Sequence, residues 1–256
     1  MTTADALKVC GNQCFQNGDF VGAEKFYTQA IIKDPTNAAF FTNRALARTR
    51  MEQWKAVVED CEKAIDLLPS SLKAYTYLGV ALLHLNRPGE SFSMSQRAYQ
   101  LAISQRSPSI SAIAASCLQA KKVKWEHAER ERVLRESALL RVTCEAVMQG
   151  GGDDEEKVDR CRRLEDVFGR AEAVRLQKRT VPDYLIDNIT FGVMWDPVIT
   201  IHGHSYDRST LIDHLKRSQT DPLTREPLKE SDLRPNLALR AASEEFLKEN
   251  GWAVDW

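Results

Sequence analysis

Small residues recur at a constant interval through the N-terminal part of the chain. They form two series with a step of 34 residues: Ala30, Ala64 and Ala98, and Gly11, Ala45 and Gly79. Pro35 and Pro69 follow the same step, and Ile103 stands where a third proline would lie. Small side chains let two helix backbones approach closely, and a proline ends one helix before the next unit begins. The pattern therefore predicts pairs of antiparallel helices that repeat every 34 residues.

This period is typical of tetratricopeptide repeats, and the chain resembles that family over residues 4–105. We predict three repeats, at 4–37, 38–71 and 72–105. A single repeat cannot bury its own apolar face, so the three repeats should stack into an α-solenoid. The first helix of each repeat should then line a concave groove.

Polar residues on these first helices supply a candidate anion-binding site. They are Lys8, Asn12, Asn43 and Lys73. The stretches LKVCGN, TNRAL and LKAYTYLG resemble the dicarboxylate clamp of chaperone-binding tetratricopeptide domains. The resemblance implies that these lysines and asparagines bind the carboxylates at the C-terminal tail of a heat-shock chaperone. It also implies that Tyr77 contacts an apolar residue upstream in the tail. The alternative is that all of them are ordinary solvated helix residues.

Residues 106–180 should form an extended helix and a helical hairpin. The stretch from about 112 to 148 is heavily charged and contains no proline or glycine. The run Gly150-Gly151-Gly152-Asp153-Asp154 interrupts it, and a second charged helix is expected from about 155 to 178. Apolar residues on the first of these helices are Trp125, Val133, Leu139, Leu140 and Val142.

The character of the sequence changes again over residues 182–256. The stretch DNITFGVMWDPVIT is rich in β-branched and aromatic residues around an Asp-Pro turn, which predicts short strands. A helix with Asp207 as its N-cap follows, then the proline-rich loop TDPLTREPL, then a final helix capped by Asn236 and stopped by Gly251. This region should form a small α+β domain.

The order of these motifs resembles a U-box, a domain of RING-like shape that holds its loops without zinc. The resemblance implies an apolar platform for a ubiquitin-conjugating enzyme, formed by Ile189, Phe191, Val193, Met194 and Pro222. It implies that Arg225 also contacts this enzyme and holds its linked ubiquitin in a reactive pose. The alternatives are core packing for Ile189, Phe191 and Met194, and a surface ion pair for Arg225.

Charge and cysteine content exclude several other classes of function. The net charge is −1, which gives no general attraction to nucleic acid or to an anionic membrane. No apolar run approaches the ~20 residues that a membrane-spanning helix needs. None of the six cysteines lies after Cys161, so a zinc-built C-terminal domain is disfavoured and we expect no metal and no cofactor. The cysteines form no CxxC pair, which favours the reducing cytoplasm, with the nucleus left open as a second location.

The two resemblances together imply a mainly α protein that couples chaperone binding to ubiquitin transfer. Because the C-terminal domain has no thiolate, ubiquitin should pass directly from the conjugating enzyme to a lysine of a misfolded, chaperone-bound client, marking it for degradation. The resemblance also implies a homodimer formed through the spacer; the alternative is a solvated spacer helix. The rival function is a non-catalytic co-chaperone, but a mere scaffold would not need the apolar ITFGVM loop together with Pro222 and Arg225.

Overall fold

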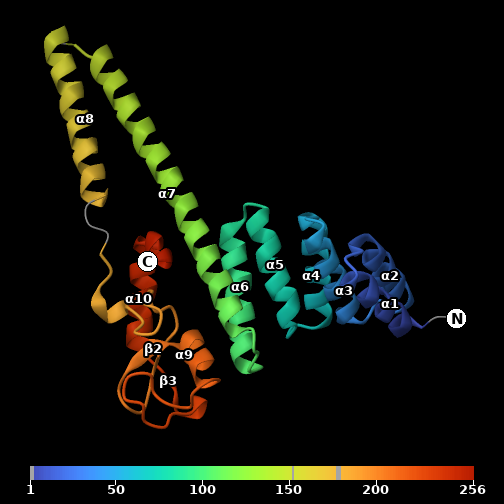
Figure 1. The fold of residues 1–256 in the computed structure, drawn as a ribbon. Helices are drawn as coiled ribbons and strands as arrows, with labels where there is room; N and C mark the ends of the chain where they lie inside the picture. Colours follow the sequence, from blue (N-terminus) through green and yellow to red (C-terminus); the bar gives the residue numbers. More distant parts are fainter. Residues whose placement is uncertain (1–2, 152, 177–179) are drawn as a thin grey trace.

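The N-terminal part of the protein is a stack of three helix pairs, as the 34-residue period predicted. The computed structural model describes residues 3–151, 153–176 and 180–256. Within residues 3–105 the helices are α1 (Ala4–Gln16), α2 (Phe20–Lys33), α3 (Ala38–Arg50), α4 (Trp54–Leu67), α5 (Leu72–His84) and α6 (Pro88–Ser104). Figure 1 shows them side by side from blue to green, in an α-solenoid. The predicted fold class is confirmed.

The small residues of the repeat lie where the two helices of a pair cross. A Cβ atom on Gly11 would lie 2.6 Å from the Tyr27 ring, and one on Gly79 would lie 2.5 Å from Ser95 Oγ. The alanines of the other series, Ala30, Ala64 and Ala98, are each 0% exposed. The turns inside the pairs also repeat, because Gly18, Glu52 and Asn86 follow the same step and all adopt positive φ. The repeat therefore specifies both the packing and the backbone of its turns.

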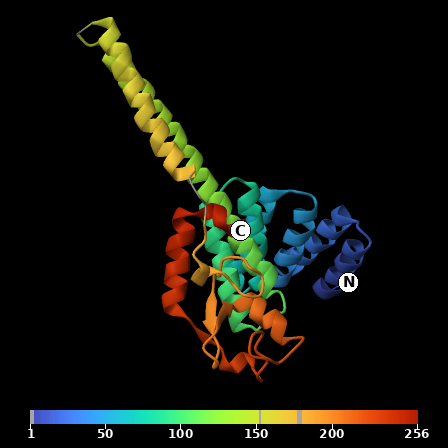
Figure 2. The same cartoon turned by 60° about the vertical axis from the view of Figure 1, so that its left-hand side comes forward.

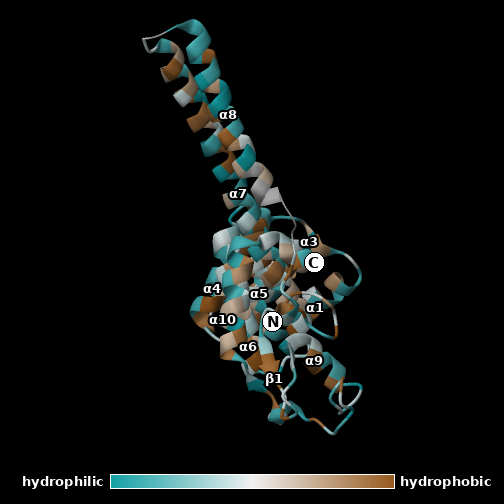
Figure 3. Cartoon of the chain, turned by 90° about the vertical axis from the view of Figure 1, so that its left-hand side faces the viewer, coloured by the Kyte–Doolittle hydropathy of each residue, from teal (hydrophilic) through white to brown (hydrophobic). Residues whose placement is uncertain are grey.

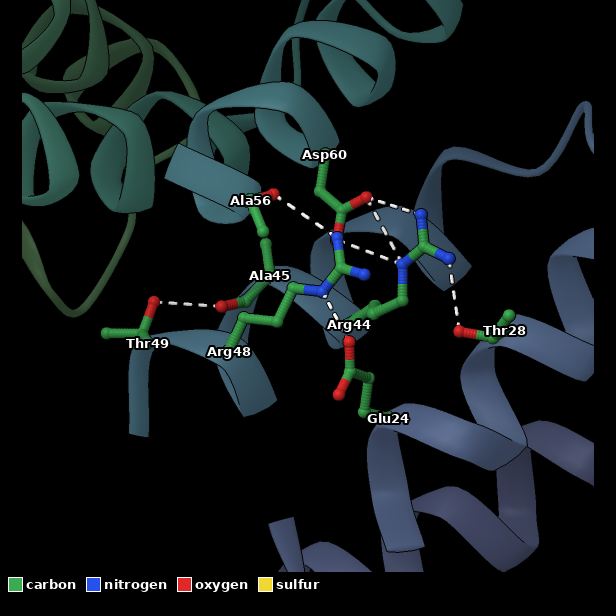
Figure 4. Close-up of polar contacts among 8 residues, drawn as sticks. All are labelled: Glu24, Thr28, Arg44, Ala45, Arg48, Thr49, Ala56 and Asp60. Carbon is green, nitrogen blue, oxygen red and sulfur yellow. Dashed lines mark hydrogen bonds and ion pairs between the residues drawn. The ribbon is translucent and has the colours of Figure 1, made fainter. Parts of the chain in front are cut away.

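A buried ion-pair network ties α3 to the two helices that flank it. Asp60 of α4 is 2% exposed and accepts hydrogen bonds from Arg44 and Arg48 of α3. The same two arginines donate to Thr28 and Glu24 of α2 (Figure 4). Because a guanidinium group has several fixed donors, each arginine can bridge two helices at once. This network sets the position of α3, which carries Asn43.

Helices α7 (Ile110–Gln149) and α8 (Asp154–Leu176) form the predicted hairpin. Figure 1 shows α7 starting beside α6 and extending far beyond the repeats, where α8 returns alongside it. Figure 3 shows brown apolar patches between the teal polar residues of the hairpin. Residue 152 of the predicted helix break and residues 177 and 178 at the predicted end of the second helix lie outside the described residues.

The C-terminal domain is a small three-stranded sheet with one α-helix between its second and third strands in the sequence and another after the third strand. Its elements are η1 (Asp183–Leu185), β1 (Pro197–Ile199), β2 (Ser205–Asp207), α9 (Arg208–Leu215), η2 (Glu230–Asp232), β3 (Arg234–Pro235), α10 (Leu237–Glu249) and η3 (Gly251–Asp255). The strand order is β2-β1-β3, and both pairings are antiparallel. Both predicted N-caps are confirmed: Asp207 accepts from the Ser209 amide and Asn236 from the Leu239 amide.

This domain packs directly against the third repeat and the first half of α7. Figure 2 shows it, in orange and red, against the green helices. Tyr99 of α6 donates a buried hydrogen bond to Asp196 at 3.0 Å, and its ring lies 4.6 Å from that of Trp195. Trp125 of α7 donates to the Glu249 carbonyl at 3.1 Å and covers Gly251. One apolar core thus spans α6, α7 and the C-terminal domain. Among the described residues, no helix combines the length and the apolar character needed to cross a membrane.

Candidate functional site

The two predicted asparagines of the groove are in contact with each other. Asn43 Nδ2 of α3 lies 3.4 Å from Asn12 Oδ1 of α1, and the Tyr27 hydroxyl donates to the same oxygen at 2.8 Å. Two donors on one oxygen fix the orientation of the Asn12 amide, so its Nδ2 group faces away from them. Burial raises the pKa of the Tyr27 hydroxyl, which therefore stays protonated and remains a donor at neutral pH. The amide of Asn12 is consequently oriented as a donor.

The two predicted lysines have different environments. Lys8 lies one helical turn before Asn12 and forms an ion pair with Asp5 at 2.9 Å. Lys73 is exposed on α5, and within the described part of the chain it forms no ion pair or hydrogen bond. Tyr77 lies one turn after Lys73 and packs partly against the core of the second and third repeats. An anion in the groove would thus find Lys73 without a charged partner among the described residues. Lys8 would first have to break its weak surface ion pair with Asp5.

The two loops of the C-terminal domain share the same construction. Each loop starts at a buried aspartate, Asp187 or Asp221, whose amide donates to the carbonyl five residues later. The residue four positions after each aspartate, Phe191 or Arg225, donates its amide back to the aspartate carbonyl. These two residues have φ of 62° and 61°, which favours glycine. Phe191 and Arg225 are therefore structurally equivalent residues at the tips of two matching loops.

Side-chain carboxylates hold these loops from inside. Asp221 Oδ1 accepts from the Tyr206 hydroxyl at 2.8 Å and from the Leu223 amide at 2.9 Å, and Asp221 Oδ2 accepts from the Thr200 hydroxyl at 3.0 Å. Burial alone would raise the pKa of the Asp221 carboxyl, but these bonds and one from the Thr224 amide lower it below its usual value. Hydrogen bonds to a buried carboxylate thus hold the second loop in place.

The Asp187 carboxylate accepts equivalent hydrogen bonds inside the first loop. It accepts from the hydroxyls of Thr190 and Thr210, at 2.9 and 3.0 Å, and from the Asp207 amide at 3.2 Å. Among the described residues, no group of three or more His, Cys, Asp or Glu side chains could hold a metal ion.

The structure separates the predicted platform residues into exposed and buried ones. Phe191 is 71% exposed, Arg225 is exposed, and Pro222 is partly exposed beside it in the second loop. Val193 is partly buried and pairs with Ile186, next to the core shared with α6 and α7. Ile189 is also partly buried and packs against the core of the domain.

Met194 is 2% exposed, so the prediction that its side chain belongs to the accessible platform is wrong. Its amide donates to the Leu185 carbonyl at 2.8 Å, which turns this part of the chain inward. The core-packing alternative therefore applies to Met194.

Two further exposed apolar side chains lie near the loops and were not predicted as platform residues. Leu223 is 53% exposed and follows Pro222 in the second loop, where it is the counterpart of Ile189 in the first. Tyr184 is 65% exposed in η1. Leu223 could have been found from the sequence by aligning the two loops on their aspartates. Exposed apolar groups at loop tips are a typical feature of protein interfaces.

Comparison of the sequence with known families and proteins agrees with this geometry. The U-box domain family matches residues 181–252. The E3 ubiquitin-protein ligase CHIP of Arabidopsis thaliana is 36% identical over 266 residues, which cover 98% of this chain and 95% of that protein. Ubiquitin conjugation factor E4 of Schizosaccharomyces pombe is 41% identical over 93 residues, 33% of this chain and 9% of that protein. Among solved structures, the first tetratricopeptide domain of Spaghetti bound to the HSP90 peptide SRMEEVD has a TM-score of 0.40 and 30% identity, covering 44% of this chain and 90% of that one.

The repeats, the hairpin and the C-terminal domain with its two matching loops together define a U-box ubiquitin ligase with tetratricopeptide repeats. The relative in Arabidopsis thaliana matches along nearly the full length of both chains. This chain belongs to the CHIP family of E3 ubiquitin-protein ligases.

Proposed function

We propose that this ubiquitin ligase binds the acidic C-terminal tail of a heat-shock chaperone in its repeat groove and ubiquitinates the client that the chaperone holds. The observation that carries the proposal is the pair of bonded amides, Asn12 and Asn43, with Lys8 one helical turn away. A terminal carboxylate would accept from the Asn12 amide and from the ammonium groups of Lys8 and Lys73. Tyr77 would contact an apolar residue of the tail.

Replacing Lys73 by alanine should weaken tail binding strongly. A charge-assisted contact contributes roughly 1.5–3 kcal/mol, so the affinity should fall by about 10- to 150-fold. The probe is the peptide SRMEEVD, and the measurement is a binding isotherm on the full chain. Lys8→Ala should cost less than Lys73→Ala, because Lys8 already has Asp5 as a partner in the free protein.

Two controls accompany this test. Lys25→Ala removes an exposed lysine of α2, away from the proposed contacts, and should bind the peptide normally. A peptide amidated at its C-terminus should lose affinity for the wild type. Equal affinity of wild type and Lys73→Ala for the free acid would contradict the groove proposal.

The U-box would recruit a ubiquitin-conjugating enzyme through Phe191, Pro222 and Leu223. Arg225 would contact the ubiquitin linked to that enzyme and restrict the thioester to reactive orientations, which is a positional contribution to the rate. The six cysteines are free and none lies in the U-box, so direct transfer to a client lysine is the chemistry that fits. Free cysteines also support the proposed location in a reducing compartment such as the cytoplasm.

The hairpin is proposed to join two copies of the chain into a homodimer. Its exposed apolar side chains are Val133, Leu134, Leu139, Val142, Met148, Val158 and Val167, which are between 44% and 69% exposed. A run of exposed apolar groups along two helices is costly in water and favours a partner surface of the same kind.

Light scattering at micromolar concentration should therefore find a dimer for the wild type. Leu139→Asp combined with Val142→Asp should convert it to a monomer without changing peptide binding. A monomeric wild type would contradict the proposed assembly.

A further inference from the structure

The turn between β1 and β2 places a histidine against the second U-box loop. His202 Nδ1 lies 2.6 Å from Glu226 Oε2, a close polar contact that is an ion pair when the imidazole is protonated. The His202 side chain is 16% exposed, whereas that of Glu226 is 61% exposed. The imidazole is therefore held by the fold, and it contacts the carboxylate of an exposed residue in the second loop.

Glu226 is the residue directly after Arg225, so the contact with His202 acts at one end of the Arg225 backbone. At the other end, the Asp221 carbonyl accepts from the Arg225 amide at 2.9 Å. The Glu226 carbonyl accepts from the Asp221 amide at 2.8 Å, which closes the loop. Arg225 has a φ of 61°, a conformation that a non-glycine residue keeps only when its surroundings enforce it. Asp221 and Glu226 together supply that enforcement.

The first loop lacks this additional contact. The residue that corresponds to Glu226 there is Gly192, which has no side chain to form an ion pair. Phe191 at the tip of the first loop is apolar, and its proposed role is to bury apolar surface against the conjugating enzyme. The exact direction of its side chain therefore matters little. Arg225 must aim a charged group, so its direction matters. The contact between His202 and Glu226 occurs in the loop whose tip residue needs orientation.

The second ring nitrogen of His202 gains no hydrogen bond from its position in the described part of the fold. Among the described residues, His202 Nε2 is buried and has no hydrogen-bond partner. A buried polar atom without a partner costs stability, so an apolar ring would suit this place at least as well for folding alone. The histidine is therefore better explained by its contact with Glu226 than by a role in the core.

We propose that His202 is a positioning residue of the ligase, which acts through Glu226 to orient Arg225 toward the ubiquitin linked to the conjugating enzyme. This inference rests on the role proposed above for Arg225. His202 does not contact the reacting groups. Its effect should therefore appear in the rate of transfer and not in the affinity for the conjugating enzyme.

The test is single-turnover discharge of a ubiquitin-loaded conjugating enzyme onto free lysine by the full-length protein. His202→Phe should lower the maximal rate by about tenfold, within the range that a small misplacement produces. The concentration of loaded enzyme at half-maximal rate should stay the same, and the melting temperature should not fall. His202→Asn should restore most of the rate, because its amide nitrogen can take the place of Nδ1.

Two further variants test whether the effect of His202 is specific and depends on Arg225. His204→Phe changes the neighbouring histidine of the same turn, whose side chain makes no hydrogen bond or ion pair within the described residues, and should discharge normally. In an Arg225→Ala background, His202→Phe should have no additional effect, because residues that act through one another are not additive.

The outcomes separate the two proposals. Normal discharge by Arg225→Ala would overturn the proposed role of Arg225 and this inference with it. Slow discharge by Arg225→Ala beside normal discharge by His202→Phe would overturn this inference alone. A His202→Phe defect that persists in the Arg225→Ala background, or that appears as a weaker affinity for the loaded enzyme, would also overturn it.

Discussion

The Phe191→Ala variant is expected to lose the conjugating enzyme while keeping its fold. Phe191 is 71% exposed, so truncating it removes little from the core of the free protein. An apolar anchor at the centre of an interface typically contributes about 2 kcal/mol or more, which corresponds to about thirtyfold in affinity. A positive φ is as unfavourable for alanine as for phenylalanine, so the substitution should not change the stability of the loop conformation. Ligase activity should fall with the affinity.

The matched control is Leu237→Ala, which removes an apolar side chain that is 70% exposed at the start of α10. It should bind and transfer normally. Met194→Ala should behave in the opposite way, with lower stability, because Met194 is buried and its loss leaves a cavity. The measurements are a binding isotherm with the free conjugating enzyme and a thermal melt. Normal binding by Phe191→Ala would remove this residue from the proposed platform.

Asp221→Ala should unfold the second loop and destabilise the whole U-box. The substitution leaves the buried hydroxyls of Tyr206 and Thr200 without their acceptor, together with the amides of Leu223 and Thr224. Each unsatisfied buried group costs about 1–3 kcal/mol, so we expect a loss of about 3 kcal/mol or more. Asp221→Asn keeps one acceptor oxygen and should be intermediate. Hydrogen exchange of U-box amides in the full chain reports this loss separately from the repeats.

The same residue predicts the direction of acid sensitivity. The lowered pKa of Asp221 means that the folded state binds this proton more weakly than the unfolded chain does. Its contribution to stability is complete above the unfolded value of about 4 and is lost as the pH falls through the folded value. Asp221→Asn should flatten this acid limb. The exposed Asp183 of η1 is the matched control, and Asp183→Asn should leave both protection and acid sensitivity unchanged. Wild-type protection in Asp221→Ala would contradict the proposed role of the carboxylate.

Much of this protein could be predicted from the sequence because the controlling interactions are local or strictly periodic. The repeat helices follow from small residues that must recur wherever two helices cross, and Gly11 against Tyr27 shows why. The N-caps at Asp207 and Asn236 act within three residues, so a single short stretch specifies them. The exposed Phe191 loop could likewise be predicted from its apolar residues beside a turn.

Only the tertiary structure decided which residues meet across the chain. The sequence indicated separate domains, but Tyr99 and Trp125 join the U-box to α6 and α7 through contacts that span 97 and 124 positions. No local pattern encodes such pairings, because an aromatic residue on a helix could pack against any neighbouring element. For the same reason the buried Met194 could not be told from the exposed Phe191 of the same stretch, and the contact of His202 with Glu226 became visible only once the strands were placed. Local sequence determined the elements and their caps, whereas long-range packing determined burial and the orientation of Arg225.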